Sequence, residues 1–317
     1  MELQSKKRVG ILRGGTGENY NSSLQHGGEI ILHILENLDH KYKTADILVD
    51  SDSIWHYNGR PVQPADLVHK VDVVWNTAQP SFSVMLDNLS IPNIGVNSFH
   101  FLFKNNRQLL KEHIKDSGVS LPRRFLLPVY QRDFDGPRET RLDSRQARQE
   151  YAFKKAKEIF EKFSSPWIVQ SFTPGVGMGI HLAKTFPELV RAIEDGAEHK
   201  ASILVEEFIS GKVASVHSVP NFRGEDFYVF PPVNVFGSLS SLEKNKLSIL
   251  ARHLHQHLGA EHYQKTNFIL NKRGKVYLLD LESTPNLKSF SHFSQACESV
   301  GAEMHHVIDH ILDKNFY

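Results

Sequence analysis

The sequence predicts an α/β (α+β) protein whose N-terminal part is an open, mostly parallel sheet. An apolar strand at residues 8–12 runs through a glycine turn into a segment, 22–38, with the apolar spacing of a helix. Two further apolar runs, 46–49 and 71–75, are set apart by looping or helical segments, as in parallel sheets. Near the C-terminus, strands at 263–270 and 276–279 flank a turn and predict a hairpin.

The composition indicates a globular chain of two or three domains. It has 317 residues, 40% of them apolar and 23% charged. The formal net charge of +1 lacks the basic excess of a nucleic-acid-binding protein, so no nucleic acid is expected as a partner. Cys297 is the single cysteine and is predicted to be a small buried or half-buried side chain. No run approaches the ~20 apolar residues of a membrane span, so we expect no membrane partner and a cytoplasmic location.

The first turn, 13–19, contains glycines that would let backbone amides approach a ligand at a helix N-terminus. The full GxGxxG pattern is missing, so a purely structural turn is an equal alternative. Residues 55–60 are predicted to form a turn, and 91–96 a last short strand of this domain. A helix then extends to about Ser117.

Basic side chains recur along that helix at spacings of three and four, at Lys104, Arg107, Lys111 and Lys115. A solvated helix face is the simpler interpretation of this stripe. Extended chain is predicted for 121–127, a charged surface loop for 131–148, and a helix for 150–163.

A second glycine-rich segment, 171–179, lies between strands at 167–170 and 180–183. A strand, glycine loop and strand can lay backbone amides over a phosphate, although a plain hairpin is the competing interpretation. The remaining expected elements are helices at 186–193, 239–258 and 302–312 and strands at 203–209, 214–219, 226–230 and 233–236. His253, His255 and His257 on the second of these helices are not expected to form a three-histidine metal face.

Two carboxylates follow the second strand of the C-terminal hairpin. Asp280 and Glu282 are two residues apart, so in extended chain both leave the same face. Mg²⁺ that holds substrate phosphates typically uses one or two carboxylates, which makes a cation site one interpretation and a pair of solvated acids the other.

The order of these segments resembles the ATP-grasp superfamily and, within it, the D-alanine:D-alanine ligases. The resemblance spans essentially the whole chain and is carried by four segments in order, 8–24, 91–110, 203–211 and 267–291. It implies an ATP-grasp fold with an N-terminal substrate-side domain, 1–103, a central subdomain, 104–213, and a C-terminal subdomain with the metal hairpin, 214–317.

The resemblance also implies the ligands and their residues. ATP and Mg²⁺, with Mn²⁺ as an alternative, are the expected cofactors, and Asn267, Asp280 and Glu282 are the expected metal ligands. Lys265 would stabilise the transition state, Asn286 would occupy the oxyanion-binding position, and Ser291 would contact the substrate. The expected ATP contacts are Lys104, Gln170, Gly175, Gly177, Glu206, Glu207, Phe208, Ile209 and Leu279.

Several positions depart from the family pattern. Gln170 stands where a second phosphate-binding lysine is expected, Val213 where an acid would hold the ribose, and Lys265 where the family has arginine. Asn286 replaces a glycine, and residues 75–79 lack the family histidine. The expected function is therefore an ATP-dependent carboxylate–amine ligase that makes a dipeptide such as D-alanyl-D-alanine from small amino-acid or carboxylate substrates. The alternatives are a binding or regulatory module without catalysis and another ATP-grasp activity, and a homodimer is one option for the oligomeric state.

Overall fold

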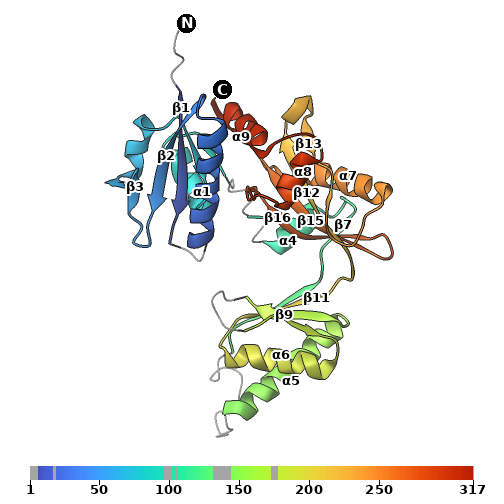
Figure 1. Cartoon of the computed structure of the whole chain (residues 1–317). Coiled ribbons are helices and arrows are strands. Elements are labelled where there is room, and N and C mark those ends of the chain that lie inside the picture. The colour runs from blue at the N-terminus through green and yellow to red at the C-terminus, as the bar shows by residue number, and fades with distance from the viewer. Residues whose placement is uncertain are drawn as a thin grey trace. The chain divides into compact units, whose positions relative to one another are not determined.

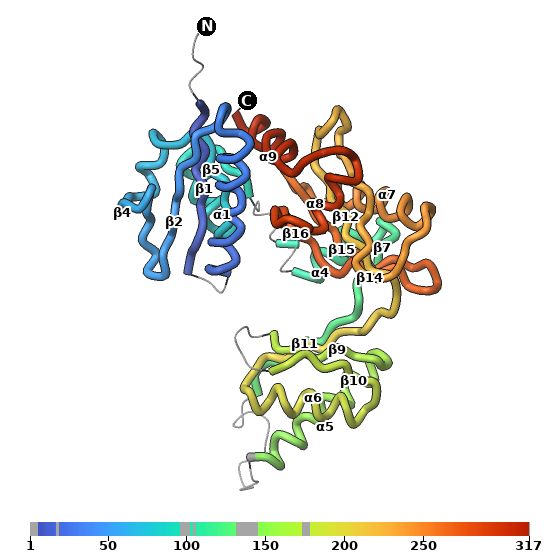
Figure 2. Tube along the Cα trace, in the orientation of Figure 1, coloured from blue at the N-terminus to red at the C-terminus, as the bar shows by residue number. Residues whose placement is uncertain are grey.

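The computed structural model describes residues 6–16, 19–95, 102–103, 106–130, 144–172 and 178–316. By the contacts between its residues the chain divides into two compact units. Unit 1 contains residues 1–120 and 211–317, and unit 2 contains residues 121–210. Figure 1 labels many of the elements, and Figure 2 traces the same chain. The three-way division into 1–103, 104–213 and 214–317 remains a prediction.

The first sheet of unit 1 has the strand order β4-β3-β2-β1-β5-β6. Its strands are β1 (Lys7–Gly14), β2 (Tyr42–Val49), β3 (Trp55–Tyr57), β4 (Arg60–Val62), β5 (Val73–Asn76) and β6 (Asn93–Ile94). Strands β2, β1, β5 and β6 are parallel, which is the open parallel sheet that the sequence predicts. The helix α1 (Tyr20–Asn37) covers one face, and a 3-10 helix (Pro64–His69) and α2 (Pro80–Asn88) contribute to the core on the other.

Residues 55–60, expected to be only a turn, instead contain β3, a two-residue turn and the first residue of β4. β3 pairs antiparallel with both β2 and β4. Asn58 and Gly59 both have positive φ, 48° and 79°, as a tight hairpin turn requires. Burial of Trp55 beneath Phe82 provides the packing that holds this edge hairpin on the sheet.

The second sheet of unit 1 has the order β13-β12-β15-β16-β7, with β14 also paired to β12. Its strands are β7 (Val119–Ser120), β12 (Gly211–Pro220), β13 (Phe227–Val229), β14 (Val233–Phe236), β15 (Gln264–Asn271) and β16 (Val276–Glu282). The helices of this part are α4 (Arg107–His113), α7 (Ser241–Leu258), α8 (His292–Glu298) and α9 (Met304–Asp313), with 3-10 turns at Phe222–Gly224 and Lys314–Phe316. One apolar core joins α1, α8 and α9 to both sheets.

The helix α8 was not predicted, because it has only seven residues. Ser291 caps it by accepting a hydrogen bond from the Ser294 amide, and Phe293, Ala296 and Cys297 face the core. Cys297 is buried, as its composition-based interpretation expected, and burial raises the pKa of its thiol to about 12.

Unit 2 is a four-stranded antiparallel sheet with helices on one face. The strand order is β10-β9-β11-β8, formed by β8 (Arg124–Leu127), β9 (Trp167–Ser171), β10 (His181–Ala183) and β11 (Ile203–Glu207). The helices α5 (Ser144–Lys162) and α6 (Phe186–Glu198) pack on it around Trp167, Val169 and Val205. Within the part of the chain that the structure describes, no helix is long and apolar enough to cross a membrane.

Candidate functional site

The central feature of unit 1 is a polar face built by three adjacent strands. The backbone register aligns His217 on β12 with Lys265 on β15 and Glu282 on β16. The next row on the same face aligns Ser215, Asn267 and Asp280. Side chains of directly paired residues share a face of a sheet, so six polar residues from three strands come together. We call these six residues the polar face.

A β-bulge in β16 lies beside the predicted metal ligands. Asn267 pairs with Asp280, whereas the next residue of β15, Phe268, pairs with Leu278, so Leu279 is the extra residue. Its run of apolar residues, 276–279, predicts a strand buried on both faces, but only Val276 and Leu278 are buried, whereas Tyr277 and Leu279 are half-buried. Bulges re-aim side chains and are frequent next to active sites.

Hydrogen bonds connect most of the polar face. Lys265 Nζ lies 2.9 Å from Glu282 Oε1, and Asn267 Nδ2 lies 3.4 Å from the same oxygen. On the other side of Asn267, Ser215 Oγ donates to Asn267 Oδ1 over 2.6 Å. Asp280 is exposed at the edge of the face and has no hydrogen-bond partner among the described residues. The sequence-based prediction thus named residues that the fold brings together.

His217 was not singled out from the sequence, although it belongs to the polar face, where it lies beside Lys265. It is 1% exposed, and its Nδ1 lies 2.6 Å from the Tyr263 hydroxyl. Its Nε2 is buried without a hydrogen-bond partner in the described structure. Burial, reinforced by the charges of Lys265 and His292, lowers the pKa of His217 to about 3, so the ring is neutral at physiological pH.

Oxygen atoms on the polar face suit a hard divalent cation. Asp280 and Glu282 supply two carboxylates, and Asn267 supplies an amide oxygen if its side chain turns over. Within the described residues there is no group of three or more histidine, cysteine, aspartate or glutamate side chains that could hold a metal. The oxygen donors of Asp280, Glu282 and Asn267 are of the kind that a hard divalent cation prefers.

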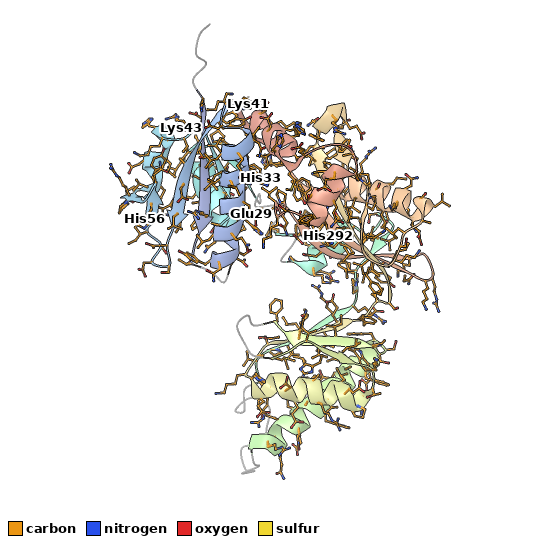
Figure 3. All side chains as sticks on the ribbon, viewed as in Figure 1. Glu29, His33, Lys41, Lys43, His56 and His292 are labelled. Carbon is orange, nitrogen blue, oxygen red and sulfur yellow. The ribbon has the colours of Figure 1, made fainter. Side chains whose placement is uncertain are left out.

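The turn after β16 contains the other two predicted catalytic residues. Ser291 Oγ donates to the Asn286 carbonyl over 2.8 Å, and the Lys288 amide donates to Asn286 Oδ1 over 3.1 Å. Next to them, His33 on α1 contacts the Leu287 carbonyl through Nε2 at 3.0 Å. Figure 3 labels His33 on α1 and His292 on α8. Asn286 and Ser291 are thus joined within one turn that α1 also supports.

A second candidate surface lies on unit 2. The face of its sheet opposite the helices carries Leu126 of β8 and Leu182 of β10, which are 52% and 46% exposed. Ile168 and Gln170 of β9 and Leu204 and Glu206 of β11 lie on the same face, as the register shows. We call this the open face. Glu206 lies opposite Arg124 at one end of this face, and an apolar surface that ends in polar side chains suits a planar heterocycle with polar substituents.

Ion pairs hold the end of β11 in place. Arg124 Nε donates to Glu206 Oε1 over 2.6 Å, and Arg123 binds Glu207 through Nε and Nη2 over 3.0 and 3.1 Å. Glu206 is buried, and Phe208 and Ile209, which follow the strand, are exposed and half-buried. Lys104, Gly175 and Gly177 lie outside the described residues, so the predictions on them stay predictions.

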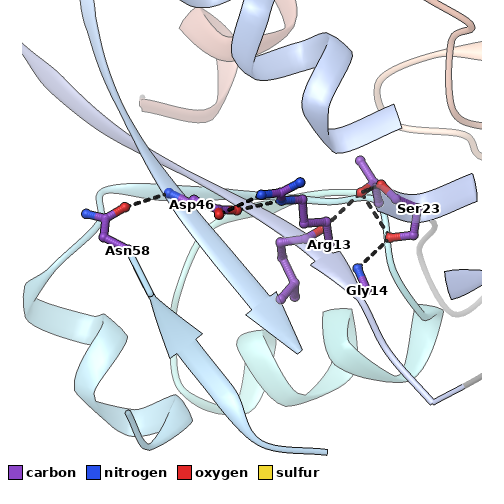
Figure 4. A network of polar contacts seen from close by, with 7 residues as sticks. Arg13, Gly14, Ser23, Asp46 and Asn58 are labelled. Atoms are coloured by element: carbon purple, nitrogen blue, oxygen red, sulfur yellow. Dashed lines mark hydrogen bonds and ion pairs between the residues drawn. The ribbon is translucent and has the colours of Figure 1, made fainter. Parts of the chain in front are cut away.

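The glycine turn after β1 lies beside the turn after β5. The Gly14 amide donates to Ser23 Oγ on α1, whose Oγ lies 3.3 Å from Thr77 Oγ1 (Figure 4). Gln79 Nε2 donates to Thr16 Oγ1 over 3.1 Å. These residues follow the carboxyl ends of two neighbouring parallel strands, where the strand order reverses, and this is where open α/β sheets bind ligands. Arg13 is occupied by a bidentate ion pair with Asp46, at 2.6 Å for each contact.

Comparison with known proteins agrees with this architecture. Residues 232–313 match the family model described as the D-ala D-ala ligase C-terminus. The D-alanine–D-alanine ligase of Geobacter sulfurreducens is 24% identical over 176 residues, which are 49% of this chain and 54% of that protein. That of Desulfotalea psychrophila is 23% identical over 183 residues, 50% of this chain and 56% of that protein. The chain thus spans about half the length of the curated relatives it matches.

Solved structures match over nearly the whole chain. D-alanyl-alanine synthetase A from Vibrio cholerae aligns with a TM-score of 0.75 at 16% identity and covers 99% of both chains. The VanG D-Ala:D-Ser ligase from Enterococcus faecalis aligns with a TM-score of 0.72 at 16% identity, covering 98% of this chain and 100% of the other. The D-alanine–D-alanine ligase from Bacillus anthracis, complexed with ATP, gives a TM-score of 0.67 at 14% identity, with 98% and 97% covered. At these identities the matches show a shared fold.

Proposed function

We propose that this chain, which has the ATP-grasp fold of the D-alanine–D-alanine ligases, is an ATP- and Mg²⁺-dependent carboxylate–amine ligase. In such a reaction a substrate carboxylate attacks the γ-phosphorus of ATP and releases ADP. The amino group of a second substrate then attacks the acyl carbon of the acylphosphate, loses a proton and expels phosphate, which leaves an amide. A dipeptide such as D-alanyl-D-alanine, a peptidoglycan building block, is the product that the relatives suggest.

The observation that carries this proposal is the polar face. The transferring phosphoryl group and the acylphosphate are anionic, so the reaction needs positive charge held in a fixed place. Lys265 supplies one positive charge, and Asp280, Glu282 and Asn267 supply the oxygen atoms that would hold a divalent cation. A bound Mg²⁺ would neutralise phosphate oxygens there. The bulge at Leu279 sets the rows in register at this point of the sheet.

The open face of unit 2 supports nucleotide binding. Leu126, Ile168 and Leu182 offer apolar surface for a purine ring, and Glu206 and the backbone of 207–209 would hold its amino edge. Gln170, on the same face, can donate one neutral hydrogen bond to phosphate, which is weaker than a lysine charge. Lys104 and the loop with Gly175 and Gly177 are proposed to bind the phosphates.

The amino-acid substrates are proposed to bind next to the turns that follow β1 and β16. Asn286 and Ser291 present an amide and a hydroxyl in the turn after β16, and Ser291 is the candidate substrate contact. Small amino-acid or carboxylate substrates are the expected partners, and a homodimer is one proposed assembly.

ADP release measured with a coupled enzyme assay tests the function. The full chain would be supplied with MgATP and single or paired amino acids of both configurations, including D-alanine, D-serine and glycine. We expect ADP release that requires an amino acid and falls at least a hundredfold in Asp280→Asn, because the cation loses a carboxylate. The matched control is Asp226→Asn, which changes a carboxylate in unit 1 that belongs to neither the polar face nor the turn after β16.

A binding or regulatory module is the second candidate. It is favoured by the ion pair of Lys265 with Glu282, which neutralises one of the two carboxylates, and by Gln170 in place of a lysine. Such a module would release no ADP with any substrate pair, and the same assay therefore separates the two functions.

A further inference from the structure

We propose that Lys265 and a divalent cation exchange at Glu282: the ammonium group holds the carboxylate when no cation is bound and leaves it when one binds. The inference rests on the proposed cation site and goes beyond it, because it assigns the site a built-in competitor. It also gives Ser215 a role, which is to hydrogen-bond the Asn267 amide while that amide turns over.

Lys265 lies where a cation at Glu282 would have to compete with it. It is directly paired with Glu282 on the neighbouring strand, and its side chain is only 15% exposed, against 34% for Glu282. Partial burial strengthens the 2.9 Å contact compared with an ion pair in bulk water. A cation that binds Glu282 Oε1 must therefore displace a charged group rather than water.

Asn267 turns its amide nitrogen, not its oxygen, toward Glu282. Its Nδ2 points to Glu282 Oε1, and its Oδ1 accepts the Ser215 hydroxyl. In this orientation the amide presents hydrogen atoms, not a lone pair, to the space between the carboxylates. Because a metal ion requires the oxygen, the amide has to turn by about half a revolution when a cation binds.

Ser215 can support both orientations of that amide. A hydroxyl donates one hydrogen bond and accepts others, so Ser215 can donate to Oδ1 in one orientation and accept from Nδ2 in the other. Ser215 is 1% exposed, so it stays next to Asn267 on β12 throughout. The Ser215 oxygen can therefore keep a hydrogen bond to the Asn267 amide in both orientations.

Together these contacts form a cation-free state of the site. Lys265 neutralises Glu282, Asn267 donates to the same oxygen, and Asp280 is the carboxylate of the polar face that has no partner among the described residues. Cation binding has to break two contacts of Glu282, and it returns a free ammonium group to the polar face. The competition makes cation affinity lower than two carboxylates would give.

Mn²⁺ titration followed by electron paramagnetic resonance tests the exchange directly, on the full chain without nucleotide. The informative variant is Lys265→Met, which keeps the aliphatic stem and removes the charge. We expect it to bind Mn²⁺ about tenfold more tightly than the wild-type protein, because the competing hydrogen-bonded charge is gone. A merely structural ion pair would give the opposite result, since its loss would disorder Glu282 and weaken the site.

Two variants serve as controls. Lys265→Arg retains a competing cation and should bind Mn²⁺ as the wild-type protein does. Lys212→Met removes another lysine of unit 1, whose Nζ is paired with Glu243 at 2.7 Å, and should leave Mn²⁺ affinity unchanged. Circular dichroism shows whether each variant is folded.

The possible outcomes separate the exchange from the proposed function. If folded Lys265→Met binds Mn²⁺ as the wild-type protein does, or more weakly, the exchange is overturned. The proposed cation site is not affected by that result. If no variant binds Mn²⁺ and Asp280→Asn leaves ADP release unchanged, the proposed cation site itself is wrong. The exchange is then wrong as well.

Discussion

His217 Nδ1 and the Tyr263 hydroxyl lie 2.6 Å apart in the interior of unit 1, one on β12 and the other just before β15. Both side chains are 1% exposed, and the ring of Phe293 packs against each of them. A neutral imidazole is therefore placed directly beside Lys265 on the polar face. A second positive charge at this position would repel Lys265, so the pair keeps the face from gaining charge near neutral pH.

The first prediction concerns stability against pH. Because the folded pKa of His217 is lowered from 6.5 to about 3, the unfolded chain binds a proton at pH 5 that the folded chain does not. Stability due to this group is fully present above pH 6.5 and falls as the pH is lowered from there toward 3. We expect a loss of about 2 kcal/mol in the free energy of unfolding between pH 7 and pH 5.

Urea unfolding at both pH values, followed by fluorescence, checks this loss against His217→Phe. The variant should lose about 2 kcal/mol less than the wild-type protein over the same interval, whatever its stability at pH 7. The same loss in the free energy of unfolding for the two proteins would show that His217 is not buried as a neutral ring.

The second prediction concerns Glu206. Glu206→Ala should weaken MgATP binding at least tenfold, because it removes a buried acceptor and frees Arg124 at the edge of the open face. Isothermal titration calorimetry measures the affinity. Glu158→Ala is the matched control, since this glutamate pairs with Lys155 on α5. Equal losses in the two variants would argue against nucleotide binding at the open face.

The third prediction concerns the apolar part of the open face. Leu182→Glu places a charge where we propose that the purine ring lies, and Leu182 is 46% exposed, so folding should change little. We expect MgATP affinity to fall by more than tenfold, with the melting temperature within a few degrees of the wild-type value. Phe153→Glu, on the exposed side of α5, is the control and should bind MgATP normally. Normal MgATP binding by Leu182→Glu would show that the nucleotide binds elsewhere.

The fourth prediction concerns the attachment of the C-terminal helix to the first sheet. The buried Tyr42 hydroxyl lies 2.8 Å from Asp309 Oδ1 and 2.9 Å from Asp313 Oδ1, both on α9. Tyr42→Phe should cost about 1–3 kcal/mol, because hydrogen bonds to charged acceptors are lost. Urea unfolding gives the value. The Tyr57 hydroxyl has one long contact of 3.5 Å among the described residues, so Tyr57→Phe should lower the free energy of unfolding by less. A larger loss for Tyr57→Phe than for Tyr42→Phe would contradict this account.

Part of the candidate site could be predicted from the sequence because it depends on local spacing. Asp280 and Glu282 are two residues apart on one strand, and the turn at 271–274 fixes their hairpin partners. The contacts of Ser215 and His217 could not be derived in this way. They depend on the register of β12 with β15, and about fifty residues separate Ser215 from Asn267 along the chain.

Other differences also have local physical causes. The bulge at Leu279 shifts the alternation of the strand, and periodicity cannot show where an extra residue is accommodated. The β3–β4 hairpin was missed although Asn58-Gly59 is a strong turn signal, because its strands have only three residues each. The α/β class and the parallel sheet were predicted because long apolar runs determine them.

The most direct test of the proposed ligase uses D-alanine with ¹⁸O in its carboxyl group, together with MgATP and the full chain. In an acylphosphate mechanism a carboxylate oxygen attacks phosphorus, and that oxygen leaves with phosphate when the amine attacks the acyl carbon. Mass spectrometry should therefore find one ¹⁸O in each phosphate released, and a dipeptide in equal amount. Phosphate without the label, or no phosphate from any amino-acid pair, would contradict the account.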